Sequence, residues 1–155
     1  MSELLVEVRS AASRFEAARW TGDDCARLAE ELARTAKACT AAAARASARA
    51  VECGRGDVEW VARTSGVTPA QARENLSTTA ALGDCPATSE AVAEGAVSLR
   101  QAREIARAEG AVPGSEGVLL QIAKFQGDFM KQLSRSFERR RRGDFTESPA
   151  GWSEK

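Results

Sequence analysis

The residues best suited to chemistry in this sequence lie around two short phrases that are nearly identical. VTPAQARE begins at Val67 and VSLRQARE begins at Val97. Arginine can bind phosphates and base edges, and Thr, Gln and Asn side chains can contact base edges or phosphate oxygens. If the segment around the first phrase approaches DNA, the contacting residues are Arg63, Thr68, Gln71, Arg73 and Asn75.

A second candidate set is the run of four arginines near the C-terminus, namely Arg139, Arg140, Arg141 and Arg142. Four consecutive arginines cover every side of a helix, so they cannot all be buried. They are suited to phosphate contacts, because each neutralised phosphate releases a counterion and strengthens binding at low salt. The alternative is a solvated helix end, where positive charge is favoured by the helix dipole.

The sequence offers little to a metal or a cofactor. It contains no histidine, and its four cysteines stand at positions 25, 39, 53 and 85. No two cysteines have the short spacing of a zinc knuckle, so we predict no metal site and no cofactor. We expect the cysteines to act as small buried apolar residues.

The composition favours helices with a thin core. Leu, Ile, Val and Phe together supply 27 of the 155 residues, whereas Ala alone supplies 31 and the net charge is zero. Alanine forms helices well but buries little apolar area, so we expect a marginally stable all-α monomer that relies on a second copy or a partner. The N-terminus lacks the features of a signal peptide and no apolar run is long enough for a membrane span, which predicts a cytoplasmic protein.

Residues 1–56 are predicted to form a long helical hairpin. Its first helix has an apolar face at helical spacing, made by Leu4, Val8, Ala11, Phe15 and Ala18. The second helix is expected from about Asp23 to Glu52, and two glycines after Cys53 end it.

The second helix carries a stripe of small residues, which we call the seam. Every seventh residue from Cys25 to Cys53 is Cys, Leu, Cys, Ala and Cys, and positions 29, 36, 43 and 50 are all Ala. Small side chains allow two helix backbones to approach closely, so the seam predicts a helix–helix contact. Its partner is either the first helix or the same helix of another protomer, in a homodimer.

Residues 57–111 are predicted to form a helix-turn-helix-like module. Asp57 is a helix cap, Gly66 provides a tight turn, and Thr68 followed by Pro69 starts the next helix, which should bury Ala72, Leu76 and Ala80. Ala62 is small enough for the two helices to cross closely. Asn75 stands nine residues after Gly66, where such motifs usually have an apolar residue.

The second phrase predicts another helix start. Ser98 and Gln101 form a capping box, opening a helix that we expect to end near Glu109, and a short helix from about Pro86 should precede it. The two phrases arise either from convergence on a good helix start or from an internal duplication of a helical pair.

At these residues the sequence resembles an actinobacterial family of unknown function found N-terminal to HNH endonuclease domains. The matching positions are Trp60, Gly66, Ala72, Arg73, Pro86, Thr88, Gly95, Ser98, Gln101, Ala102 and Arg103. A fainter resemblance is to the helix-turn-helix of the ParB and KorB partition proteins. It implies that the helix of the second phrase supports a DNA-reading helix.

The resemblance implies the DNA-targeting part of an HNH-nuclease-type protein, without the nuclease itself. An HNH site needs histidine as general base and metal ligand, and this sequence has none, so we expect no enzymatic activity of that kind. The leading hypothesis is a non-catalytic DNA-binding module, and the alternative is a helical protein–protein interaction or dimerisation protein that uses the seam.

The predicted organisation is all-α. It consists of the hairpin at residues 1–56, the helix-turn-helix-like module at 57–111, basic C-terminal helices at 112–143 and a disordered tail at 144–155.

Overall fold

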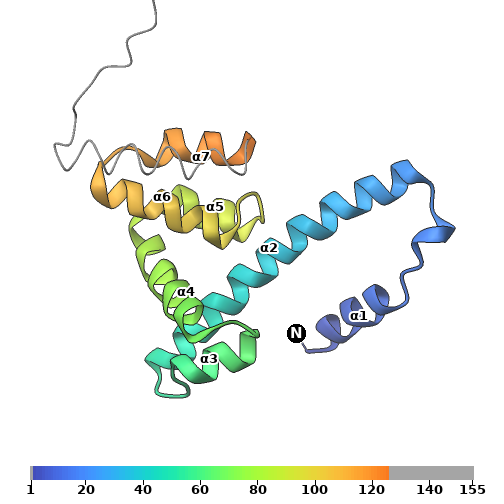
Figure 1. Cartoon of the computed structure of the whole chain (residues 1–155), viewed down its shortest axis with the longest axis horizontal. Coiled ribbons are helices and arrows are strands. Elements are labelled where there is room, and N and C mark those ends of the chain that lie inside the picture. Colours follow the sequence, from blue (N-terminus) through green and yellow to red (C-terminus); the bar gives the residue numbers. More distant parts are fainter. Residues whose placement is uncertain (1, 126–155) are drawn as a thin grey trace, which may run out of the picture. The chain divides into compact units, whose positions relative to one another are not determined.

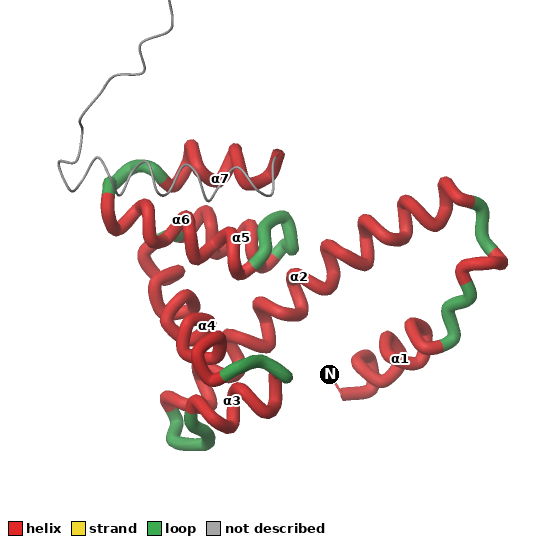
Figure 2. The backbone as a smooth tube through the Cα atoms, in the orientation of Figure 1, coloured by secondary structure: helices red, strands yellow, loops and turns green. Residues whose placement is uncertain are grey.

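The computed structural model describes residues 2–125, and this part of the chain is built from helices and short connections, with no strand (Figure 2). The prediction of an all-α protein is confirmed. The elements are α1 (Ser2–Ser13), η1 (Ala17–Arg19), α2 (Gly22–Glu52), α3 (Val58–Ser65), α4 (Pro69–Ala81), η2 (Leu82–Asp84), α5 (Pro86–Ala93), α6 (Leu99–Ala111) and α7 (Glu116–Phe125) (Figure 1). None of these helices is long and apolar enough to cross a membrane.

The chain divides into two compact units, Met1–Ala33 and Arg34–Lys155, with the boundary inside α2. The second half of α2 packs into the second unit, through Ala41, Ala44 and Val51. The predicted domain boundary after residue 56 stays a prediction. A continuous helix therefore belongs to both units, and helix ends do not mark the boundary.

The first unit contains no buried side chain among residues 3–33. The expected apolar face of α1 is exposed, since Leu4 keeps 60% and Val8 keeps 50% of its surface, and Phe15 beyond the helix keeps 40%. Phe15 does contact Trp20, with ring centroids 6.0 Å apart. The helix forms at Leu4, Val8 and Ala11 as predicted but ends at Ser13, so Phe15 and Ala18 of the predicted face lie beyond it. No described side chain of the first unit is buried by this face.

The second unit has a core made by five helices and the second half of α2. Fully buried residues come from α5, α6 and α7, which contact one another, as Val92, Ile105 and Leu119 show. A smaller cluster joins α3 to α4 through Val61, Ala62 and Ala72. Alanines occupy many of these positions, so the helices approach closely and few large side chains are needed.

The predicted helix starts are confirmed in detail. The Asp57 carboxylate accepts a hydrogen bond from the Trp60 N–H (2.7 Å), and the Thr68 hydroxyl accepts one from the Gln71 N–H (3.2 Å). Ser98 and Gln101 form the reciprocal capping box. These bonds satisfy backbone N–H groups that have no partner inside the helix.

The seam of α2 is not the face that packs within the protomer. Leu32 is 50% exposed, Cys39 and Cys53 are exposed and Cys25 is half-buried, whereas the buried residues of α2 are Ala41 and Ser47. The expectation of four buried cysteines is therefore wrong for all but Cys85, which is 2% exposed. The reason is that the core clusters contact a neighbouring face of α2, at Ala41, Ala44 and Val51.

Two local expectations also differ from the structure. Ala80 is exposed, whereas Thr78 on the same helix, α4, is buried. The helix of the second phrase continues past Glu109 through Gly110 to Ala111. The expected features beyond residue 125, including Arg139–Arg142 and the tail, lie outside the described residues.

Candidate nucleic-acid interface

The turn between α3 and α4 brings the two helices together at small residues. Gly66 adopts a left-handed conformation (φ 66°, ψ 32°), and its N–H donates to the Ala62 carbonyl oxygen. Only glycine adopts this conformation without strain from a Cβ atom. Val67 then packs against the cluster of Val61, Ala62 and Ala72, which fixes the start of α4 beside α3.

The two nearly identical phrases lie on helices that contact each other, α4 and α6. Their alanines, Ala72 and Ala102, are both fully buried. The Arg103 guanidinium of the second phrase forms an ion pair with the Glu74 carboxylate of the first. Each phrase thus supplies a helix start, a small packing residue and a charged residue at the edge of the same contact.

A groove with a volume of about 620 Å³ runs between α4 and α6. Three arginines line it, Arg73 from α4 and Arg103 and Arg107 from α6, together with Glu74 and Ser77. Arginine side chains at this density can bind phosphate or carboxylate groups, because the guanidinium presents several donors in one plane.

The structure places the predicted contact residues on two sides of α4. Arg73 lines the groove and keeps 63% of its side chain exposed, with its guanidinium 3.8 Å from the Glu59 carboxylate. Asn75 is half-buried and lines a different cavity. Residues two apart on a helix do not share a face, so Arg73 and Asn75 cannot approach one ligand together.

The other predicted residues near the turn are exposed, namely Arg63, Thr68 and Gln71. The Thr68 hydroxyl already accepts the capping bond from Gln71 N–H. The remaining set, Arg139 to Arg142, lies outside the described residues.

Sequence reasoning missed Arg103 and Arg107 as members of the candidate interface. The doubled phrase contains the signal, because Arg73 and Arg103 occupy the same place in the two copies and Arg107 follows one turn later. The sequence does not show that α4 and α6 lie side by side, because helix starts alone do not specify which helices pack together.

Carboxylates balance the arginines of the groove. Arg103 binds Glu74 and lies 3.4 Å from Glu104, and Arg73 faces Glu59. Residues 1–125 contain 15 basic and 17 acidic residues, a net charge of −2. A polyanion approaching this face must therefore displace carboxylates from the arginines, and long-range attraction from the described part is weak.

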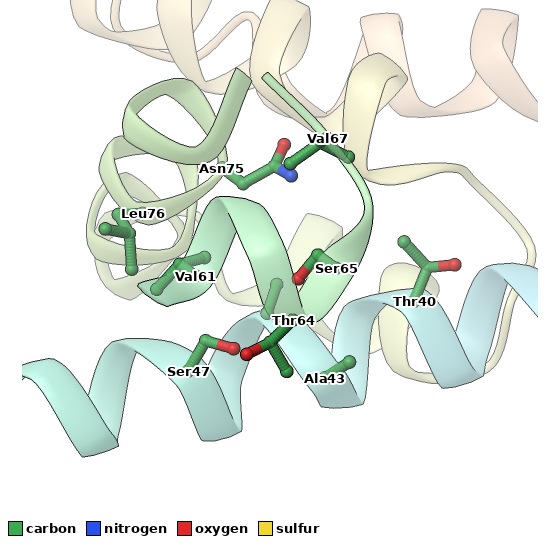
Figure 3. Close-up of a pocket in the computed structure, with 10 residues that line it drawn as sticks. Thr40, Ala43, Ser47, Val61, Thr64, Ser65, Val67, Asn75 and Leu76 are labelled. Carbon is green, nitrogen blue, oxygen red and sulfur yellow. The ribbon is translucent and has the colours of Figure 1, made fainter. Parts of the chain in front are cut away.

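A second cavity, of about 230 Å³, lies between α2, α3 and α4. Figure 3 shows Thr40, Ala43 and Ser47 of α2 facing Thr64 and Ser65 of α3, with Asn75 and Leu76 contributed by α4. Every side chain that lines it is uncharged. It is suited to an apolar or neutral group rather than to a phosphate.

The remaining ionisable groups with shifted pKa values have structural roles. The Glu109 carboxylate accepts hydrogen bonds from the N–H groups of Gly114 and Glu116 (both 2.6 Å) and from the Ser115 hydroxyl (3.3 Å), which lower its pKa. Glu116 in turn accepts from the Thr88 N–H at 2.7 Å. Glu109 therefore connects α6 to the start of α7, and Glu116 connects α7 to the start of α5.

Cys85 is unsuited to nucleophilic chemistry. Burial raises the pKa of its thiol, and the nearby carboxylates of Glu116, Glu109 and Asp84 raise it further. A thiol held in the neutral form is a poor nucleophile. Within residues 2–125 no group of three His, Cys, Asp or Glu side chains could hold a metal ion.

Comparison of the chain with family models, with curated proteins and with solved structures found no match. The resemblance to the HNH-associated family and to the partition proteins thus stays a hypothesis based on the residues that carry it.

Proposed function

We propose that this protein is a non-catalytic DNA-binding module of the helix-turn-helix type. The observation that carries the proposal is the arrangement of α4. It follows α3 after a short turn at Gly66, it is exposed on its outer side, and Arg73 on that side lies beside Arg103 and Arg107 of α6. In helix-turn-helix proteins the second helix enters the major groove and neighbouring elements contact the backbone.

In this proposal the residues divide into two groups by position. Arg63, Thr68 and Gln71, near the start of α4, approach base edges or the adjacent phosphates, and Arg73, Arg103 and Arg107 contact the phosphate backbone along the groove. Asn75 is omitted because it lines the cavity between α2, α3 and α4. The α6 helix both supports α4 and contributes charge.

The proposal requires the arginines to exchange partners. The Arg73–Glu59 distance of 3.8 Å indicates a loose, exposed pair, which costs little to separate. We assign the sequence-independent attraction to DNA to Arg139–Arg142, which lie outside the described residues, because residues 1–125 lack it. In keeping with the resemblance, we infer that the module targets DNA within an HNH-nuclease-type protein that lacks the nuclease, in the cytoplasm.

A salt-titrated binding assay on a random duplex tests the proposal. We expect binding at low salt that weakens steeply as salt rises, and the Arg73→Gln variant should reduce the slope of log affinity against log salt by about 0.9, one phosphate contact. The matched control is Arg27→Gln, which removes an exposed arginine paired with Asp24 in the first unit.

Substitution of all four residues Arg139–Arg142 by Gln should weaken binding to every duplex alike, since phosphate contacts carry no sequence information. The proposal is wrong if the full chain fails to bind duplex at low salt. It is also wrong if Arg27→Gln weakens binding as much as Arg73→Gln does.

The second candidate function is helical protein–protein interaction, including homodimerisation through the Cys25–Cys53 helix. A specific observation favours it, namely that the seam of α2 is exposed in the protomer. Sedimentation equilibrium of the full chain over a range of concentrations tests self-association. A single monomeric species at all concentrations would contradict a homodimer.

A further inference from the structure

The cavity between α2, α3 and α4 has no part in the proposed DNA contacts. Its ten lining residues all belong to the second unit, so its shape does not depend on where the first unit lies. The exposed residues Thr40, Ala43 and Thr64 lie at its mouth, and the buried residues Ser47 and Val61 lie at its floor (Figure 3). The cavity is therefore open to solvent and reaches a part of the molecule that is otherwise buried.

Ser47 places a hydroxyl without a partner at the floor. The residue keeps only 7% of its surface, and within residues 2–125 its side chain makes no hydrogen bond. Helical hydroxyls can donate to the carbonyl oxygen four residues earlier, as Thr40, Thr78 and Thr79 do here at 2.8, 2.7 and 2.9 Å. Ser47 does not, so its O–H is available to an occupant of the cavity. A buried hydroxyl without a partner costs free energy, and an occupant that bonds to it removes this cost.

Asn75 supplies a second group without a partner. The residue is half-buried, and its side-chain amide makes no hydrogen bond within the described residues, since the bond from Thr79 goes to its backbone carbonyl. Helix-turn-helix motifs usually have an apolar residue at this place, nine residues after Gly66. A primary amide offers two N–H donors and an acceptor oxygen. An amide at this position gains a partner only from an occupant of the cavity.

The rest of the lining determines the charge and polarity of the occupant. No side chain that lines the cavity is charged, and Val61, Val67 and Leu76 give it apolar walls. An ionised group placed there would lose hydration without gaining an opposite charge. The occupant must therefore be neutral, apolar over part of its surface, and able both to donate and to accept hydrogen bonds.

We propose that this cavity binds a small neutral molecule that has an apolar body and a carboxamide group. A carboxamide both donates and accepts hydrogen bonds at one end, which matches the Ser47 hydroxyl and the Asn75 amide. The volume of the cavity is about 230 Å³, and an engineered cavity of roughly 150 Å³ binds benzene, so a benzene-sized ring with one carboxamide fits. The inference is independent of DNA binding.

Titration of the full, isotope-labelled chain with benzamide, followed by NMR, tests the proposal. We expect saturable shifts of the backbone amide signals of Ser47, Thr64 and Asn75, with a dissociation constant of about a millimolar, as is usual for so small a ligand. Benzoate has the same shape but carries a charge, so it should bind at least about ten-fold more weakly. Signals of α7, which does not line the cavity, should not move.

Two substitutions remove the polar groups of the cavity with little change in its shape. Ser47→Ala and Asn75→Leu should each weaken benzamide binding about two- to ten-fold, because each removes one hydrogen-bond partner. The matched control is Ser77→Ala, which removes an exposed hydroxyl of α4 that lines the groove with α6 instead. This variant should leave the dissociation constant unchanged.

The same two variants distinguish a ligand site from a structural role. Because neither side chain has a partner among the described residues, Ser47→Ala and Asn75→Leu should leave the melting temperature of the ligand-free protein unchanged or raise it. A lower melting temperature for both variants would show that the two groups stabilise the fold, and it would contradict the proposal.

Blocking the mouth of the cavity provides the third test. Ala43→Phe places a ring at the mouth and should abolish benzamide binding, whereas Ala42→Phe, at the neighbouring exposed position outside the lining, should not affect it. The proposal is wrong if benzamide binds Ala43→Phe as well as it binds the wild type, or if benzoate binds as well as benzamide. Absence of saturable shifts at about ten times the expected dissociation constant would show that the cavity holds water only, which also overturns the proposal.

Discussion

The first and second units of this protein are built from similar helix-forming sequence but bury very different amounts of it. Residues 3–33 have no buried side chain, whereas the part from Arg34 to Lys124 contains every buried residue that the structure describes. Of the eight exposed large hydrophobic residues in the described part, seven precede residue 34. Helical propensity and an apolar face therefore suffice for a helix, but they do not ensure that the face is buried.

The same contrast appears in the large apolar side chains of the two units. In the first unit Leu4, Leu5, Val6 and Val8 all keep half or more of their surface, and the hairpin predicted for residues 1–56 stays a prediction. In the second unit, by contrast, helices meet at fully buried alanines such as Ala72 and Ala102. Small residues at the helix crossings produce close packing in the second unit, whereas the large apolar residues of the first unit are exposed.

Truncation of large apolar side chains should show the largest difference between the two units. Ile105→Ala should lower the free energy of unfolding by about 2–5 kcal/mol, because Ile105 is fully buried and its removal leaves a cavity. Leu4→Ala, at an exposed site, should change it by no more than about 0.5 kcal/mol. Urea denaturation at protein concentrations where the chain is monomeric measures both. Equal costs would contradict the contrast between the units.

Two glycines with the same backbone conformation should sharpen the comparison within the second unit. Gly66 and Gly95 have φ values of 66° and 72°, but a Cβ atom on Gly66 would meet nothing within 4 Å, whereas one on Gly95 would overlap the carbonyl oxygen of Arg34. Both alanine variants incur the left-handed strain of about 1–2 kcal/mol. Gly95→Ala should cost about 1–3 kcal/mol more, because α2 must move away from the α5–α6 turn.

The same urea denaturation experiment measures the free energy of unfolding of the glycine variants. An asparagine at each position provides the control, since Asn tolerates the left-handed conformation but still has a Cβ atom. Gly66→Asn should recover part of the loss, whereas Gly95→Asn should not. Recovery at both positions would show that the contact with Arg34 is unimportant.

The smallest expected effect is a pH dependence that differs between the units. The pKa of Glu109 in the folded protein lies below its ordinary value of 4.5, chiefly because of the hydrogen bond from Gly114 N–H. The ionised carboxylate therefore stabilises the fold fully above about pH 5, and this contribution is lost as the pH falls through 4.5 toward the folded-state pKa. Glu109→Gln should remove that part of the acid destabilisation, as measured by thermal unfolding from pH 3 to 7.

Asp24 is the corresponding group in the first unit. Its pKa is also lowered, first by the Thr21 hydroxyl and then by Arg27. Because these partners lie within one turn and no buried residue depends on them, Asp24→Asn should leave the main unfolding transition unchanged at every pH. A shift as large as that of Glu109→Gln would show that the first unit contributes to the cooperative core.

Much of the local structure could be predicted from the sequence, because helix starts are encoded by neighbouring residues. Asp57, Thr68 and Ser98 cap the helices that their spacing predicts, since a side-chain oxygen and the N–H three residues later need no distant partner. The left-handed turn at Gly66 follows in the same way from a single residue without a Cβ atom. The start and end of α2 were placed within one residue for the same reason.

Only the tertiary structure decided which faces meet. The seven-residue spacing of the seam predicts a contact, but α2 has a second row of small residues at Ala41, Ala44 and Ala48, and the rest of the core packs on that row. Arg73 and Arg103 likewise form one groove only because α4 and α6 are adjacent. Capping depends on atoms within a few residues, whereas the choice between alanine faces depends on the total surface that distant helices can bury, a quantity that no short stretch of sequence contains.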